Sequence, residues 1–174
     1  MSDRDGPETR TSTGDRQLDP RFVDQQRLVG RLRALALSAI TFSALLVTLV
    51  AADGLAPWAR VALAGAWLIA MTCLAWFAEV WPARVYGHTR YRLDDDGLQI
   101  ARGVYWRTVT HVPRSRVQHT DVSQGPIERR YGLGSLVVYT AGTDHAMVGL
   151  PGLAHETAVQ LRDDLRVDHA DDAV

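Results

Sequence analysis

Two long uncharged apolar runs lie close together in the first half of the chain and limit what it can fold into. The first covers residues 34–52 and the second residues 61–78. Each has about the length that an α-helix needs to cross the roughly 30 Å hydrocarbon layer of a bilayer. The segment between them, Asp53–Arg60, has only eight residues. The two runs therefore predict a transmembrane helical hairpin over residues 34–81.

The alternative is a pair of buried helices in a soluble domain. A helix at the surface of a soluble core normally carries a polar face at 3.6-residue spacing, and neither run does. The only hydroxyls in them can be satisfied by backbone carbonyls of their own helix: Ser38, Thr41, Ser43, Thr48 and Thr72. A cleaved signal peptide is disfavoured too, because a long polar segment precedes the first run and a second run follows it at once.

Positive charge flanks the two apolar runs on their outer sides. Arginines before the first run and after the second outnumber the single cation of the connecting loop, Arg60; they are Arg27, Arg31, Arg33, Arg84, Arg90 and Arg92. Cationic flanks favour the cytoplasmic side of a membrane. We expect a multi-pass protein of the plasma membrane with both termini in the cytoplasm.

Small residues in the second run recur at helical spacing. Ala62, Ala66 and Ala70, with Gly65 beside them, form a stripe that would let another helix approach closely. The predicted partner is the first run, through Ala39, Ser43 or Ala44; a second copy of the protein is the competing choice. Trp67 lies in the middle of the second run and is interpreted as a packing residue.

The segments at the two ends of the chain are polar. Residues 1–17 have almost no apolar side chains, which predicts disorder. Residues 18–33 carry a loose apolar stripe with arginines between, and predict an amphipathic juxtamembrane lead-in that either lies along the headgroups or extends the first helix. Residues 168–174 form a polar tail.

Beyond the second run the hydrophobic pattern changes to period two. Strands are expected at 89–93, 98–102, 105–112, 117–123, 135–140 and 145–150, with 127–131 as a short strand or a turn. Asp94–Gly97 and residues 141–144 are the expected turns. Residues 153–167 predict an amphipathic helix with Ala154, Ala158, Leu161 and Leu165 on one face. Residues 86–167 thus predict a mainly-β or α+β domain: a small antiparallel sandwich or barrel capped by a C-terminal helix.

The composition offers little for catalysis or metal binding. The net charge is −1, there is no Lys, and the single Cys73 lies inside the second apolar run. None of the six His pair at the i, i+4 spacing of a helical metal site, although His111 and His119 could meet across strands. Asp94–Gly97 lacks the alternating ligands of a calcium loop. We expect no catalytic, cofactor or metal site, no small-molecule substrate, and a protein that is not an enzyme.

Four stretches in the second half of the chain together resemble a known family. They are VPRSRVQ at 112–118, VSQGPIER at 122–129, YGLGSL at 131–136 and YTAG at 139–142. Their order, after two apolar runs, is similar to the YdbS-like bacterial pleckstrin-homology family of membrane proteins. The resemblance implies two near-orthogonal sheets closed by a C-terminal helix, on the cytoplasmic side of the membrane. It does not imply a defined activity.

Two binding functions remain open for the domain. The first is a membrane-anchored scaffold that binds another membrane or pleckstrin-homology protein, or another copy of itself; the resemblance favours it, because related domains often assemble. The alternative is a module that senses anionic lipid, although the acidic turn at 94–96 has the wrong sign for inositol-lipid binding. Nucleic-acid binding lacks an aromatic stacking pattern.

Exposed cations are the candidate contacts for a partner or for lipid. Arg116 and Gln118 are two residues apart and are expected on one face of a strand. The full set of candidates is Arg84, Arg90, Arg92, Arg114, Arg116, Gln118, Arg129 and Arg130.

Overall fold

The computed structural model describes residues 14–51, 54–141 and 147–171, with side chains through Leu165. The chain forms two compact units. One, called here the helical hairpin, comprises Val23–Val85; the other, called the β domain, takes the residues up to Phe22 and those from Tyr86 onward. The predicted disorder of residues 1–13 and the turn predicted at 141–144, apart from Ala141, lie outside the described residues.

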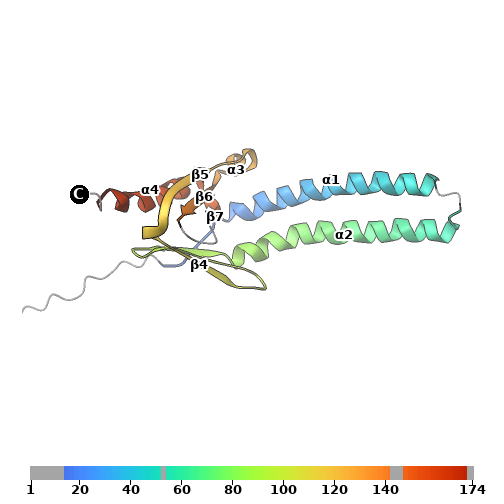
Figure 1. Ribbon diagram of the computed structural model, residues 1–174. Helices are drawn as coiled ribbons and strands as arrows, with labels where there is room; N and C mark the ends of the chain where they lie inside the picture. Colours follow the sequence, from blue (N-terminus) through green and yellow to red (C-terminus); the bar gives the residue numbers. More distant parts are fainter. Residues whose placement is uncertain (1–13, 52–53, 142–146, 172–174) are drawn as a thin grey trace, which may run out of the picture. The chain divides into compact units, whose positions relative to one another are not determined.

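The helical hairpin consists of α1 (Arg21–Ala51) and α2 (Pro57–Gly87), which run side by side (Figure 1). Both are long and apolar enough to cross a membrane. Each has 31 residues, or about 46 Å at the rise of an α-helix, so each extends beyond its predicted span. The lead-in therefore continues the first helix, which was one of its two predicted forms.

Four of the five hydroxyls named in the apolar runs bond to their own helix as expected. Those of Thr41, Ser43, Thr48 and Thr72 each donate to the carbonyl four residues earlier, at 2.8–2.9 Å. The packing role of Trp67 is confirmed as well. Its indole N–H donates to Thr41 Oγ1 at 3.0 Å.

The contact between α1 and α2 does not use the predicted small-residue stripe. Ala62, Ala66 and Ala70 are exposed, as are Ala39, Ser43 and Ala44. The half-buried positions recur at three- and four-residue spacing instead: Ala34, Ser38, Thr41 and Leu45 on α1, and Trp67, Met71, Leu74 and Ala78 on α2. The prediction was wrong about the face because the large Trp67 and Met71 side chains occupy the seam. Within this hairpin, the stripe is left on the outer surface.

The β domain contains two antiparallel sheets. The first has the order β1-β2-β3-β4 and the second the order β5-β6-β7. The strands are β1 (Arg16–Gln17), β2 (Arg90–Asp94), β3 (Gly97–Arg102), β4 (Thr108–Pro113), β5 (Val117–Ser123), β6 (Leu133–Thr140) and β7 (Met147–Ala154). A 3₁₀ turn, η1 (Arg114–Arg116), joins the sheets between β4 and β5.

The helix α4 (His155–Asp171) packs on β5, β6 and β7. Its Ala158, Leu161 and Leu165 are buried in the same core as Leu98, Ile100, Leu133, Leu136, Val138, Leu150 and Leu153. The predicted fold, two sheets closed by a C-terminal helix, is confirmed. The helix begins at His155 rather than 153 and includes residues 168–171, which had been assigned to the tail.

β7 continues past its predicted end at Leu150, through Pro151 and Gly152. Pro151 is tolerated because β7 is an edge strand, where a missing N–H leaves no ladder bond unmade. The register with β6 shifts between Gly134 and Leu136, which marks a bulge at this point. Gly152 has a φ of +80°, a conformation that favours glycine.

The segment before α1 belongs to the β domain, which changes the predicted boundaries. Arg16 and Gln17, assigned to the disordered tail, form β1 and pair with Tyr91 and Arg90 of β2. Leu18 and Phe22, assigned to the juxtamembrane lead-in, are buried in the core. Both ends of the hairpin are therefore built into one folded domain, so they must lie on the same side of any membrane that the hairpin crosses.

Asp19 and Phe22, close to the start of α1, contact the bulge in β7 at Gly152. The backbone N–H of Asp19 donates to the carbonyl of Gly152 at 2.9 Å. A Cβ added at Gly152 would lie 2.5 Å from the ring of Phe22. Asp19 then begins α1, because its carboxylate accepts from the N–H of Arg21 at 2.8 Å.

Candidate functional site

The glycine-rich stretch that carries most of the family resemblance forms a compact structural motif. Residues 127–131, predicted as a short strand or a turn, belong to the helix α3 (Pro126–Tyr131). Pro126 suits the first helical position because its missing N–H would have no intrahelical partner there. The Glu128 carboxylate accepts from the N–H of Gly125 at 2.7 Å and from the hydroxyl of Ser135 at 2.8 Å.

The other end of α3 is closed by Gly132. Its φ is +67°, the left-handed conformation of a helix C-cap. Its carbonyl accepts from the N–H of His155, at the start of α4. These bonds connect α3 to β6 and to the start of α4, so the stretch has a structural role.

Arg114 and Arg92, both predicted as contact residues, bond to other parts of the β domain. Arg114 donates to the carbonyl of Asp94 at 3.3 Å and to that of Asp164 at 2.8 Å, which ties the β2–β3 turn to α4. Arg92 donates to the carboxylate of Asp15 at 3.0 and 2.8 Å. Both side chains are half-buried.

Arg116 and Gln118 do not share a strand face as predicted. Arg116 lies in η1, before β5 begins. The register of β5 against β6 shifts between Val117 and His119, so Gln118 is the extra residue of a bulge. The period-two argument failed because it assumed an unbroken strand. Both side chains are exposed.

The remaining candidates are exposed but lie on separate elements: Arg84 on α2, Arg90 on β2, and Arg129 and Arg130 on α3. Within the β domain, Arg90 pairs with Ala101 near one end of the first sheet. Arg114 adjoins the opposite end, where its N–H donates to the carbonyl of Asp96. The predicted set therefore does not form one cationic patch.

The histidines that could have met across strands lie in different sheets. His111 of β4 pairs with Gln99, whereas His119 of β5 pairs and stacks with Tyr139, their ring centroids 4.0 Å apart. Among the described residues, no group of three or more potential ligands is placed to hold a metal ion.

The outer edge of β4 is the open feature of the first sheet. β4 ends the strand order, and its outer side has no strand partner in the described part of the chain. Val109 on this strand is 50% exposed. A hollow of about 130 Å³ adjoins the strand, lined by Thr110, His111, Val112, Pro113, Arg116, Thr140 and Val148. The sequence predicted a strand here. Its position at the edge of the sheet depends on which strands pair with one another, and this cannot be read from the residues of β4 alone.

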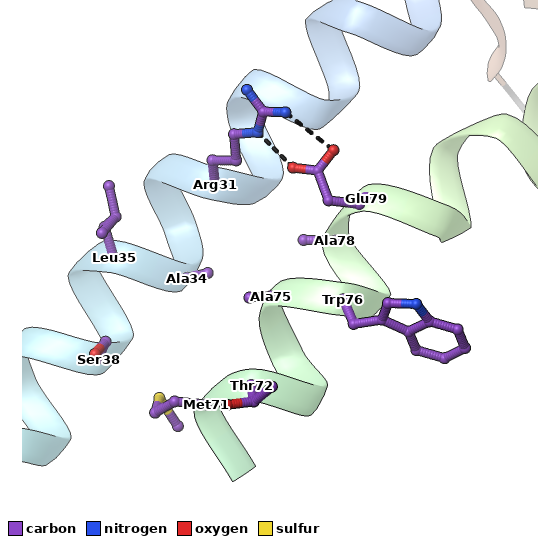
Figure 2. Close-up of a pocket in the computed structure, with 10 residues that line it drawn as sticks. All are labelled: Arg31, Ala34, Leu35, Ser38, Met71, Thr72, Ala75, Trp76, Ala78 and Glu79. Carbon is purple, nitrogen blue, oxygen red and sulfur yellow. Dashed lines mark hydrogen bonds and ion pairs between the residues drawn. The ribbon is translucent and has the colours of Figure 1, made fainter. Parts of the chain in front are cut away.

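The helical hairpin has a second polar feature that the sequence analysis missed. Arg31 of α1 forms a two-point ion pair with Glu79 of α2, with Nη2 3.0 Å from Oε2 (Figure 2). Arg27 donates to the backbone carbonyl of Glu79 at 3.2 Å. The sequence did contain a signal for this pair. Glu79 is a single acidic residue directly after the second apolar run, and Arg27 and Arg31 lie just before the first run, which is the same end of the hairpin.

This ion pair lies at one end of a hollow of about 730 Å³ along the two helices. Ala34, Ala75 and Ala78 lie between the helices in Figure 2, and Trp76 points away from α1. The lining is mostly apolar, as expected for a surface in contact with acyl chains. The ion pair joins the helices at the depth where the apolar runs end.

These features define the class of protein: a membrane hairpin that carries a two-sheet β domain closed by a helix. The sequence matches the family described as "Bacterial PH domain" over residues 33–168, and the chain belongs to that family. It is also 38% identical over 76 residues to the "UPF0699 transmembrane protein YdbS" of Bacillus subtilis (strain 168). That match covers 44% of this chain and 46% of the relative, so the chain aligns with about half of that protein's length. No solved structure matches the chain.

Proposed function

We propose that this membrane protein is a non-enzymatic scaffold whose PH-like domain binds an extended segment of a partner protein along β4. The supporting observation is the open edge of β4 (Thr108–Pro113) beside its hollow. An unpaired strand edge offers backbone donors and acceptors to an added strand, and adjacent hollows accept alternate side chains. The exposed Arg116 and Gln118 lie close to the end of this edge in sequence and would contact the partner.

A headgroup site made of the predicted arginines has less support. Arg92 and Arg114 already bond to Asp15 and to backbone carbonyls, and the exposed arginines are spread over several elements. A selective phosphate site needs several cations that converge.

We further propose that the β domain faces the cytoplasm of a bacterial cell, with the hairpin in the plasma membrane. The support is the excess of arginine on the flanks that join the β domain over the connecting loop. The proposed partner is another membrane protein, because a domain held at the bilayer meets such proteins at high effective concentration.

Site-specific photo-crosslinking in cells tests the strand-addition site. A photoreactive residue is placed at Val109 in the full-length protein, and at Asp95, an exposed turn residue, as the matched control. We expect an adduct from position 109 whose crosslinked peptide maps to one segment of one membrane protein. Adding His111→Pro should reduce the adduct, because the register with β3 turns the backbone N–H of His111 toward the open side of β4, and proline removes that donor.

Two outcomes would contradict this proposal. Equal adducts from positions 109 and 95, or none from position 109, would show that the β4 edge is not the binding site. A crosslinked peptide from this chain itself would replace the separate partner with a second copy.

A further inference from the structure

Two aromatic side chains stand out at the tip of the β3–β4 connection. Trp106 is 87% exposed and Tyr105 is 76% exposed. They are the most exposed large apolar side chains in the described part of the β domain. Val109, at the start of β4, is 50% exposed. Aromatic groups gathered on one loop indicate a contact surface, whereas scattered exposed apolar residues need no explanation.

Strand register places this tip at a particular end of the first sheet. Arg90, three residues after the end of α2, pairs with Ala101, and Arg102 pairs with Thr108 across the β3–β4 connection. β1 pairs with the same part of β2, where Gln17 lies opposite Arg90, shortly before α1 begins. The aromatic tip and both connections to the membrane hairpin therefore belong to one end of the sheet.

Charge differs between the two ends of this sheet. The aromatic tip is flanked by Arg102 and Arg107, both exposed. The opposite end carries the β2–β3 turn with Asp94, Asp95 and Asp96. An anionic bilayer surface attracts the first end and repels the second.

We propose that the β3–β4 tip docks on the interfacial layer of the bilayer that holds the hairpin. Trp106 and Tyr105 enter the headgroup region, where amphipathic rings are most favourable. Arg102 and Arg107 approach the lipid phosphates. This contact does not depend on strand addition at β4 and uses none of the arginines predicted as contacts.

Quenching by brominated lipid tests the proposal in the full-length protein. Emission is compared between the wild type and Trp106→Phe in nanodiscs of phosphatidylcholine and phosphatidylglycerol, with and without brominated acyl chains. The four other tryptophans are common to both proteins, so the difference isolates Trp106. We expect blue-shifted Trp106 emission that loses intensity when brominated lipid is present.

A matched control moves the reporter to the other end of the sheet. Asp95→Trp in the Trp106→Phe background should give water-exposed emission that iodide quenches and brominated lipid does not. Replacing phosphatidylglycerol with phosphatidylcholine should weaken quenching of Trp106 only.

Two results would overturn the proposal. One is Trp106 emission as red-shifted and as insensitive to brominated lipid as that of the Asp95→Trp reporter. The other is protection of Trp106 from iodide that appears only when a partner protein is added, which would assign the tip to a protein contact. Both positions lie on exposed turns, so neither substitution is expected to disturb folding.

Discussion

The helical hairpin and the β domain satisfy their polar groups in different ways. In the hairpin, hydroxyls such as Thr41 and Thr48 bond to carbonyls of their own helix, so most of its structure is local in sequence. In the β domain, a strand at 16–17 pairs with one at 90–91, and Phe22 packs at the Gly152 bulge. The hairpin can therefore be read from short windows of sequence, whereas the β domain closes only through contacts across the inserted hairpin.

The largest expected effect comes from a substitution that weakens the packing of residues before the hairpin into the β domain. Phe22→Ala removes a ring that is 5% exposed in the β-domain core, and should cost about 3–5 kcal/mol of stability. Hydrogen exchange of the amides of β6 in the full-length protein measures the loss. Phe42→Ala is the control, because Phe42 lies on the hairpin and is half exposed. Equal effects of the two substitutions would contradict the assignment of Phe22 to the β domain.

The next effect tests the fit between Phe22 and the bulge. Gly152→Ala places a Cβ against the Phe22 ring at a residue with positive φ, and the backbone conformation alone should cost about 1–2 kcal/mol. The stability cost of Gly152→Ala should be smaller in a Phe22→Leu background, because the smaller leucine side chain leaves space for the added Cβ. Strictly additive effects in this double-mutant cycle would show that the two residues do not interact.

A smaller effect concerns pH. Burial raises the pKa of the Tyr91 phenol, and the nearby Arg16 acts in the opposite direction. The folded-state pKa of Tyr91 lies above its unfolded-state value. The folding stability that Tyr91 contributes is therefore complete below about pH 10 and is lost as pH rises through the folded-state pKa. Tyr91→Phe should therefore lose less stability than the wild type on titration above that pH. Parallel curves, followed by circular dichroism, would argue against this role.

The smallest effect should be confined to the hairpin. Glu79→Gln weakens the contacts with Arg27 and Arg31, so the helices should separate more widely at that depth. Distances between spin labels at residues 35 and 76, in a Cys73→Ser background, should broaden. Asp24→Asn is the control, because the Asp24 ion pair with Arg27 lies within α1. The test fails if Asp24→Asn broadens the distances as much as Glu79→Gln does.

The sequence predicted those parts of the fold that have a local signature. Both apolar runs, the bounds of β5 and the buried face of α4 follow from charge and period, although the bulge at Gln118 in β5 does not. β1 was missed because two polar residues, Arg16 and Gln17, have no pattern of their own, and their partner lies across the hairpin. α3 was missed because it has only six residues and begins at Pro126 directly after Gly125, a pair that is typical of a turn. The bond between Glu128 and Ser135 that helps to hold it cannot be read from the sequence.

The candidate site was less predictable than the fold. The arginines selected from the sequence include Arg90 and Arg116, which are exposed. They also include Arg92 and Arg114, which bond within the domain. Sequence spacing placed Gln118 beside Arg116, and a bulge moved it. The open edge of β4 and the aromatic tip depend on which strands pair, which is a property of the whole sheet.

Thiol labelling in intact bacterial cells tests the central claim, that one domain receives both ends of a membrane-crossing hairpin. Single cysteines are placed at Gly14, Gly54 and Asp95 in a Cys73→Ser background and treated with a membrane-impermeant reagent. The account predicts labelling of position 54 in intact cells, and of positions 14 and 95 only after the membrane is permeabilised. Labelling of 14 and 95 from opposite sides of the membrane, or of 54 from the same side as both, would contradict it.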